Sequence, residues 1–345
     1  MSAVLVAGGA GYVGSHAVKA LAAAGYDVVV FDNLSAGHAE AVRRIAGVFP
    51  ARRVELITGD ILDADAVRRA LASSGAEAVM HFAARLLVGE SVREPIGYYR
   101  ANVTGTLSVL GAMAEAGVQR FVFSSTAATF GEPQTTPIDE SHTQRPINSY
   151  GETKLAVERA LPHLERAYGI RSIVLRYFNA AGADPEGLIG EDHHPEEHLI
   201  PRALAAVQGG EPLVVFGDDY PTPDGTCVRD YVHVSDLADA HVAALRRLEG
   251  GGASTSYNLG NGDGITVKEL IDAVADVTGR PVPHSVGARR PGDPARLVAS
   301  NARARTELGW KPRLGAVRDI VRTAWAWHST HPDGYGDREG HRSPE

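Results

Sequence analysis

Short apolar runs alternate with longer, Ala-rich amphipathic segments through the first half of the chain. The runs are nearly continuous in Val, Ile, Leu and Phe, which is typical of parallel strands buried on both faces. This pattern predicts strands at residues 3–7, 27–31, 54–58, 78–81, 121–124 and 171–177. Between them it predicts helices at 13–24, 64–72, 98–116 and 150–168. The alternation indicates an α/β fold with a doubly wound parallel Rossmann sheet.

The second half is less regular and richer in Gly, Pro, Asp and His. It predicts a helix at 201–207, a strand at 213–216, an α/β stretch at 232–259, and helices at about 266–278 and 316–327. Thr266 and Glu269 form a capping box at the start of the first of these last two helices. We expect a Rossmann domain at 1–178 with a returning segment at about 232–262, and a smaller C-terminal α/β domain at 179–231 and 263–328. Residues 329–345 are expected to be a flexible tail.

Composition narrows the class of protein. Among 345 residues, 34 Lys and Arg against 42 Asp and Glu give a net charge of −8, which argues against nucleic acid as a partner. The single cysteine, Cys227, excludes a disulfide framework and fits a reducing compartment. No window has the length and apolarity of a membrane span, and the first residues do not have the pattern of a signal peptide. We expect a cytoplasmic protein with no membrane partner.

A glycine loop, GGAGYVG at 8–14, directly follows the first predicted strand and begins the first helix. Glycine permits a tight turn and a close approach of the backbone to a pyrophosphate, which the helix N-terminus then binds. Asp32 comes 18 residues after Gly14, at the end of the second strand, where a carboxylate can bind both ribose hydroxyls. Because that carboxylate repels a 2′-phosphate, NAD is favoured over NADP. The alternative for Asp32 is a turn residue at the end of a strand.

Tyr150 and Lys154 have the spacing of neighbours on one face of a helix. Ser149 and Glu152 have the spacing of a capping box, which places Tyr150 in the first turn. A nearby ammonium is expected to lower the pKa of the phenol, so that Tyr150 can act as a general base. Ser124 and Thr126 add hydroxyls at the carboxyl end of the fifth strand. The alternative is an exposed tyrosine beside a solvated lysine.

With these residues, the chain resembles the extended short-chain dehydrogenase/reductase family, and within it the enzymes that epimerise carbon 4 of UDP-sugars. The resemblance extends to about residue 327. It is carried by GGAGYVGSH (8–16), DNLS (32–35), GDI (59–61), HFAA (81–84), VGESV (88–92), SSTAATFG (124–131), SYGETK (149–154), RYFNAAGA (176–183), HLIP (198–201), VVFGDDYPTPDGTCVRDYVHVSDLADAHV (214–242) and RRPGDPA (289–295).

The resemblance implies a tightly bound NAD, regenerated in each turnover, and interconversion of UDP-glucose and UDP-galactose by transient oxidation of C4. It implies three catalytic residues: Tyr150 as the base, Thr126 as a hydrogen-bond partner of O4, and Lys154 on the nicotinamide ribose. The cofactor contacts that it implies are Gly8, Gly11, Tyr12, Val13, Gly14, Asp32, Asn33, Asp60, Ile61, Phe82, Ala83, Ala84, Asn102, Ser124, Tyr150, Lys154 and Tyr177. The UDP-sugar contacts are Thr126, Asn179, Leu199, Phe216, Arg229, Tyr231, Arg290 and Asp293.

Several alternatives remain open at this stage. The related sugar-nucleotide dehydratases and UDP-glucuronate decarboxylases carry acids after the central hydroxyl, whereas Ala127 and Ala128 stand here. A non-catalytic NAD sensor on the same fold has no need of Tyr150, Lys154 and Thr126. Leu297 falls where the family limits the room beside C2 of the sugar, so UDP-N-acetylhexosamines or UDP-pentoses are alternative substrates. The histidine-rich segment 193–198 suggests metal ligands, but no metal is expected because the implied chemistry already has its electron acceptor. The family's common homodimer is expected to form through the helices at 98–116 and 150–168.

Overall fold

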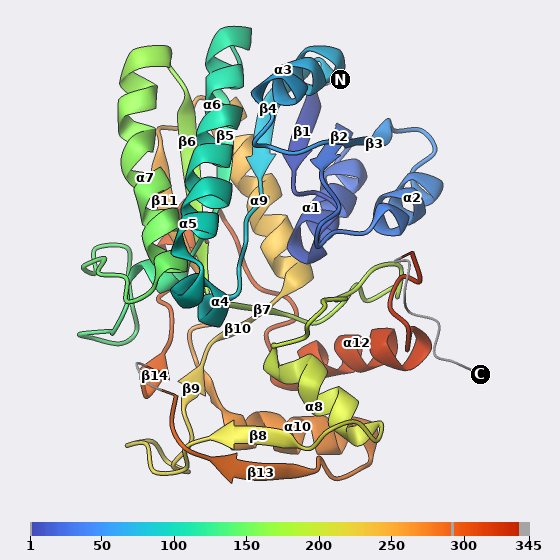
Figure 1. The fold of residues 1–345 in the computed structure, drawn as a ribbon, viewed down its shortest axis with the longest axis vertical. Coiled ribbons are helices and arrows are strands. Elements are labelled where there is room, and N and C mark those ends of the chain that lie inside the picture. The colour runs from blue at the N-terminus through green and yellow to red at the C-terminus, as the bar shows by residue number, and fades with distance from the viewer. Residues whose placement is uncertain (1, 291–292, 338–345) are drawn as a thin grey trace.

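Figure 1 shows the chain as a computed structural model, which describes residues 2–290 and 293–337. Within these residues the central sheet has seven strands in the order β11-β6-β5-β4-β1-β2-β3, and every neighbouring pair is parallel. The doubly wound sheet predicted from the sequence is therefore confirmed. The strands are β1 (Ala3–Ala7), β2 (Asp27–Asp32), β3 (Val54–Thr58), β4 (Ala76–His81), β5 (Arg120–Thr126), β6 (Arg171–Tyr177) and β11 (Thr255–Leu259).

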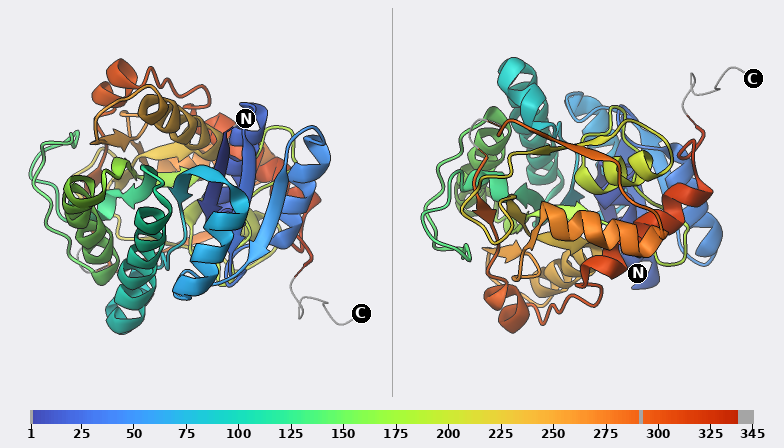
Figure 2. Two further views of the ribbon diagram at one scale, coloured as in Figure 1. Left: turned by 90° about the horizontal axis from the view of Figure 1, so that it is seen from above. Right: turned by 90° about the horizontal axis from the view of Figure 1, so that it is seen from below.

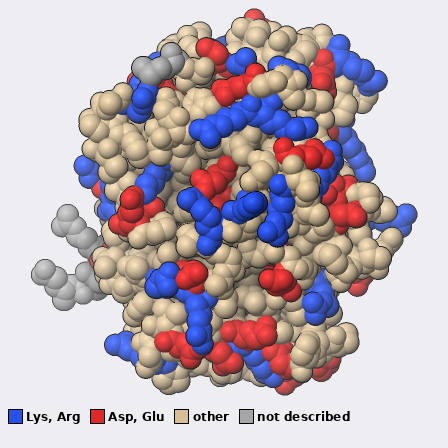
Figure 3. Space-filling model, turned by 180° about the vertical axis from the view of Figure 1, so that it is seen from behind, with Lys and Arg blue, Asp and Glu red and all other residues tan. Residues whose placement is uncertain are grey.

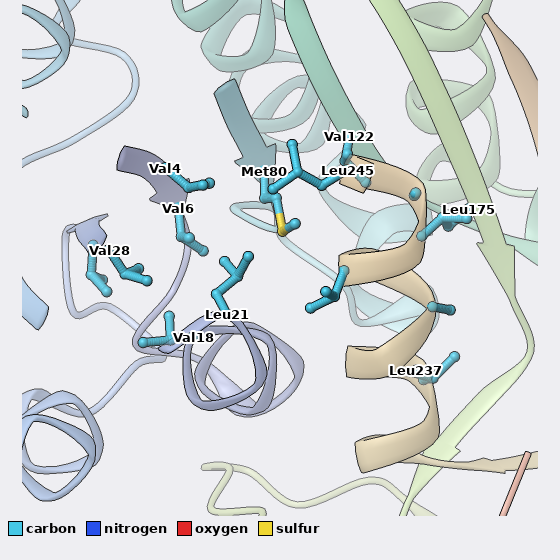
Figure 4. Packing of buried hydrophobic residues seen from close by; sticks show 14 of the residues in the cluster. Val4, Val6, Val18, Leu21, Val28, Met80, Val122, Leu175, Leu237 and Leu245 are labelled. Atoms are coloured by element: carbon cyan, nitrogen blue, oxygen red, sulfur yellow. The ribbon is translucent and has the colours of Figure 1, made fainter. Parts of the chain in front are cut away.

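Helices cover both faces of this sheet. The helices α1 (Tyr12–Ala23), α2 (Ala39–Val48) and α9 (Val234–Glu249) pack on one face, and α3 (Ala64–Ser74), α6 (Gly105–Ala116) and α7 (Ser149–Tyr168) on the other. Side chains of β1 point alternately to the two faces of the sheet. Val4 and Val6 pack with α1 and α9, whereas Leu5 and Ala7 pack with α3 and α6. Figure 4 shows the first of these layers, with side chains of α1 and α9 directed toward the strands.

A smaller α/β part lies below the carboxyl ends of the strands (Figures 1 and 2). Its apolar core joins α8 (Leu199–Val207), α10 (Val267–Thr278) and α12 (Val317–Thr330) to the strand β8 (Leu213–Phe216), which pairs with β13 (His284–Gly287). Shorter pairings connect the two parts. They are formed by β7 (Asn179–Ala181) with β10 (Tyr231–His233), and by β9 (Val228–Arg229) between β12 (Ile265–Thr266) and β14 (Arg296–Leu297). The helix α11 (Ala302–Glu307) packs beside β11.

The chain is continuously helical over the predicted range 98–116, but the first third of that range is a π-helical turn and not an α-helix. The structure has α4 (Val88–Arg93), α5 (Pro95–Tyr98), a π-helical turn η1 (Tyr99–Thr104) and only then α6. Within η1, the Asn102 amide donates to Thr153 Oγ1 at 3.0 Å and to the Arg85 carbonyl at 3.0 Å. The wider turn thus places a polar side chain against α7, which apolar periodicity cannot reveal. The helix α2 and the short 3₁₀ turn η2 (Ala127–Thr129) were not predicted either.

Two further expectations concern helix caps and the chain end. The capping box of Thr266 and Glu269 is confirmed, but the cap of α7 is Asn148, whose side chain accepts from Gly151 N at 2.8 Å, and not Ser149. The expected flexible tail begins within an ordered segment, since α12 continues to Thr330 and Tyr335 is buried, with its hydroxyl 3.1 Å from the Gly190 carbonyl. The rest of that tail, 338–345, lies outside the described residues.

The surface of the molecule carries both signs of charge. Figure 3 shows Lys and Arg interspersed with Asp and Glu over one face. Among the helices of the described chain, none combines the length and the apolar character needed to cross a bilayer.

Candidate active site

A cavity of about 860 Å³ lies where the parallel strands end at their carboxyl side. Successive strands each contribute to its wall at this edge: Gly8 follows β1, Asp32 ends β2, Phe82 follows β4, Thr126 ends β5 and Tyr177 ends β6. Ligands of open α/β sheets bind at this edge because strand order reverses there and leaves a crevice. The smaller α/β part closes the opposite wall.

The glycine loop fits a dinucleotide. A Cβ on Gly8, which has φ of +79°, would lie 2.3 Å from Ala83 N, and one on Gly14 would lie 2.1 Å from the Gly8 carbonyl oxygen. Only glycine therefore allows this packing of the loop between β4 and α1. The N-cap of α1 is Gly11, which has no side chain to cap the helix, so the first N–H groups of α1 are presented to the cavity that Gly11 lines. This is the cradle that a pyrophosphate requires.

Asp32 is fixed in the same wall. Its two carboxylate oxygens accept from Ala10 N and Leu34 N, each at 2.9 Å, and the side chain is buried. Burial raises the pKa of this carboxyl, while the two backbone hydrogen bonds lower it. Leu34 has φ of +60°, a strained conformation for a side chain of this size, and its N–H is thereby brought back to Asp32. The carboxylate is oriented before any ribose arrives.

Tyr150 and Thr126 meet at the centre of the cavity wall. Tyr150 is in the first turn of α7, and Thr126 caps η2 by accepting from Ala128 N at 3.1 Å. Burial raises the pKa of Tyr150 to about 12, and a hydrogen bond with Thr126 lowers it in part. The expectation of a lowered phenol pKa is therefore wrong for the chain by itself.

Lys154 explains this difference. Its Nζ donates to the Ser124 carbonyl at 2.9 Å, so the ammonium is directed to the end of β5 and is not among the groups that shift the pKa of Tyr150. Burial lowers the pKa of Lys154 to about 8, against the attraction of Glu158 one helical turn further on. A cationic group bound in the cavity beside Tyr150 would favour the phenolate here.

A hydrogen-bonded chain below the cavity was not predicted. His241, on α9, lies between Ser124 Oγ at 2.9 Å and the Leu237 carbonyl at 2.8 Å. Burial lowers the pKa of His241 to about 4, so its ring is neutral; Nδ1 donates to Leu237 and Nε2 accepts from Ser124. The Ser124 hydroxyl in turn is hydrogen-bonded to Tyr177. His241 is 117 residues from Ser124, and its only sequence signal is a histidine on the apolar face of a predicted helix.

The far half of the cavity carries the predicted arginines. Arg229 donates to the carbonyls of Val228 at 2.7 Å and Pro294 at 2.9 Å, and forms an ion pair with Asp293. Arg290 stacks on Phe216, with its guanidinium carbon 4.0 Å from the ring centroid. Two oriented guanidinium groups thus face a cavity that also contains the dinucleotide loop. Their planar donors suit a second pyrophosphate.

Most of the predicted site residues line this cavity. The residues on the wall are Gly8, Gly11, Tyr12, Val13, Gly14, Asp32, Asn33, Asp60, Ile61, Phe82, Ala83, Ala84, Thr126, Tyr150, Tyr177, Asn179, Leu199, Phe216, Arg229, Tyr231, Arg290 and Asp293. Asn102, Ser124 and Lys154 are buried directly behind that wall. Leu297 is also not on the wall; it packs against the buried cluster that contains Ala127 and Phe178. Wall residues that the sequence did not predict include Arg85, Arg100 and Glu191, and the wall also contains His193 and His198 of the histidine-rich segment.

Comparisons with known proteins agree with this geometry. Residues 4–260 match the NAD dependent epimerase/dehydratase family. A UDP-glucose 4-epimerase of Halalkalibacterium halodurans is 50% identical over 334 residues, covering 96% of this chain and 97% of that protein. The crystal structure of UDP-glucose 4-epimerase from Brucella ovis in complex with NAD has a TM-score of 0.90 at 48% identity, covering 94% of this chain and 98% of the other. That of the Bifidobacterium longum enzyme with NAD+ and UDP has a TM-score of 0.91 at 37% identity, covering 96% and 100%.

Proposed function

This chain belongs to the NAD dependent epimerase/dehydratase family, and from that premise we propose that it interconverts UDP-glucose and UDP-galactose. The observation that carries the proposal is the position of Tyr150 and Thr126 in the same cavity as the glycine loop and the two arginines. A dinucleotide and a UDP-sugar can therefore reach these hydroxyls from opposite ends.

Each group of residues on the wall has its own task in this reaction. The glycine loop and Asp32 would hold NAD, which would supply the hydride acceptor and donor for C4 of the sugar. Tyr150 holds the proton that leaves O4 and gives it back, and Thr126 orients that oxygen by a hydrogen bond. Lys154, fixed on the Ser124 carbonyl, lies in the buried layer behind this wall, from where it would hold the nicotinamide ribose. Arg229 and Arg290 bind the diphosphate of the sugar nucleotide.

The two alanines after Thr126 favour re-reduction over elimination. Ala127 and Ala128, in the turn η2, offer no carboxyl group to remove or deliver a proton at the carbons beside C4. A dehydratase needs such an acid, and plain return of the hydride does not. The retained hydroxyl, phenol and ammonium also argue against a chain that only senses NAD.

The experiment is to incubate the purified protein, with its bound NAD, with UDP-galactose and follow the anomeric proton signals of the two sugars. Formation of UDP-glucose to an equilibrium mixture, with transient NADH fluorescence, is the expected result. An unchanged UDP-galactose spectrum with NAD still bound would remove the proposal. UDP-N-acetylgalactosamine and a UDP-pentose are tested in parallel to distinguish the alternative substrates. This comparison is needed because Leu297 does not line the cavity and so does not decide which sugar fits.

We also propose a homodimer, a cytoplasmic location and a division of labour between the two parts. Apolar side chains exposed on the neighbouring helices α4, α5 and α6 support the homodimer. The free thiol of Cys227, the one cysteine of the sequence, supports the cytoplasmic location. The pairing of β11 with β6 supports a Rossmann domain of 1–178 completed by a segment near 232–262. The remainder, 179–231 and 263–328, would then bind the UDP-sugar.

A further inference from the structure

Two histidines and two glutamates converge on the segment that leads into α8. His198 Nδ1 lies 2.9 Å from Glu191 Oε1 and 2.8 Å from Glu196 Oε1. His193 Nδ1 lies 3.2 Å from the same oxygen of Glu191 and 3.7 Å from Glu196 Oε2. One donor atom from each of the four residues lies within 4.8 Å of every other. Both imidazoles thus turn the same nitrogen toward one point.

These separations have the size of a tetrahedral coordination shell. Nitrogen and carboxylate oxygen bind Zn²⁺ at about 2.0–2.2 Å, which places neighbouring ligand atoms about 3.3 Å apart. The distances from the two Nδ1 atoms to Glu191 Oε1, and from His198 Nδ1 to Glu196 Oε1, are 2.8–3.2 Å, and that from His193 Nδ1 to the other oxygen of Glu196 is 3.7 Å, so they lie on both sides of that value. Two carboxylates also balance one divalent ion, so the filled site is neutral. Such neutrality matters because Glu191 is only 4% exposed.

We propose that Glu191, His193, Glu196 and His198 bind one divalent transition-metal ion, with Zn²⁺ as the preferred class. Four protein ligands make a closed site, which is typical of a structural ion and not of a catalytic one. The epimerase chemistry proposed above does not depend on it. The sequence alone predicts no metal here, because that chemistry already has its electron acceptor. The spacing along the chain does not reveal that the four side chains converge.

The position of the cluster indicates which elements a bound ion would hold together, namely α1, α8 and α12. The His193 ring packs edge-on against Tyr12, with centroids 5.9 Å apart, and Tyr12 is the first residue of α1 beside the glycine loop. On the other side, His198 is the N-cap position of α8, whose first residue Leu199 lines the cavity. The Trp327 indole donates to the Glu191 carbonyl at 3.0 Å and so anchors the start of the segment on α12. A bound ion therefore fixes the cavity wall between the dinucleotide loop and α8.

The first test uses the complete wild-type protein. Metal analysis after purification without chelator should find about one zinc per chain, and chelation followed by Co²⁺ should give the visible absorption of a tetrahedral site. Chelation should also lower the midpoint of thermal unfolding, and Zn²⁺ should restore it. Absence of retained zinc, together with a Zn²⁺ titration that leaves the unfolding midpoint unchanged, would overturn the proposal. The cluster would then be a set of protonated histidines paired with carboxylates.

The second test compares variants in the same segment. His193→Gln and His198→Gln should each weaken Zn²⁺ binding by about 100-fold or more, because each removes a ligand. His194→Gln is the matched control, since His194 is in the same segment but outside the four-residue cluster. It should bind Zn²⁺ as the wild type does. Equal affinities in all four proteins would mean adventitious binding elsewhere and would refute the site, and this outcome does not depend on sugar turnover.

Discussion

At the scale of single residues, the direction of a side chain decides what the sequence spacing leaves open. Tyr150 and Lys154 are four residues apart, which predicts that they share a helix face. The spacing does not fix where a long lysine chain ends, and here Nζ reaches the Ser124 carbonyl. Consequently the pKa of Tyr150 is raised by burial to about 12. The motif thus predicts a phenol in the first turn of α7, but not the groups that surround its oxygen.

Replacing Tyr150 by Phe tests the phenol as the proton acceptor. Tyr150→Phe keeps the ring and removes the only oxygen, so turnover should fall by about 100-fold or more, in line with the loss of a general base. The affinity for UDP, measured by calorimetry, should stay within about threefold, because the arginines are untouched. Tyr168→Phe, at the exposed end of the same helix, is the control and should turn over normally. Normal turnover of Tyr150→Phe would exclude this tyrosine as the base.

Asp32 tests the choice of cofactor. Since its carboxylate repels a 2′-phosphate, Asp32→Asn should raise the affinity for NADP relative to NAD by about tenfold. The amide keeps an oxygen acceptor for Ala10 N or Leu34 N, so the loop is disturbed less than by Asp32→Ala. Competition binding of the two dinucleotides measures the ratio, with the exposed Asp65→Asn as control. A ratio that is the same in Asp32→Asn and Asp65→Asn contradicts a ribose contact of Asp32.

At the scale of elements, the periodicity of apolar residues predicts strands that are buried on both faces and helices that bury one long face. The strands β1 to β6 follow from apolar runs, because the parallel sheet is covered by helices on both faces. Strands such as β9, β12 and β14 have two residues each, which is too short for any period. Likewise, the contact of His241 on α9 with Ser124 on β5 is a product of tertiary packing. No spacing along the chain encodes it.

An exposed apolar face on α4, α5 and α6 carries the prediction of a dimer. Val92 and Ile96 are 64% and 83% exposed, and Tyr99 and Leu107 continue the face onto η1 and α6. Burying one such side chain is worth about 1.5–3 kcal/mol, so Ile96→Lys should weaken dimerisation by about tenfold or more. Sedimentation over a range of concentrations measures this. Val48→Lys, on α2 away from this face, should leave the equilibrium unchanged. A monomeric wild type would refute the dimer.

At the scale of the whole molecule, a buried and neutral histidine, His233, connects α9 of the Rossmann part with α12 of the smaller part. His233 stands at the junction of β10 and α9, where its Nδ1 accepts from Ser235 N at 3.1 Å. Its Nε2 lies 2.9 Å from Thr323 Oγ1 on α12. Protonating Nδ1 would remove the acceptor that caps α9. Burial, with a smaller repulsion from His16, accordingly lowers the pKa of His233 to about 3 from an ordinary value of 6.5.

The consequence is a loss of stability in acid, and its sign is set by proton uptake. Below pH 6.5 the unfolded chain binds a proton at His233 that the folded chain refuses, so the free energy of unfolding falls as the pH falls. One pH unit below that value, the loss is about 1.4 kcal/mol for this residue. His233→Asn retains a capping side chain and cannot titrate, so between pH 7.5 and 5.5 its urea-measured stability should fall by about 1.4 kcal/mol less than that of the wild type. The exposed His163→Gln serves as control and should behave like the wild type. Parallel curves for wild type and His233→Asn would mean that His233 has the same pKa in the folded and the unfolded chain, which would contradict a His233 that is held neutral between α9 and α12.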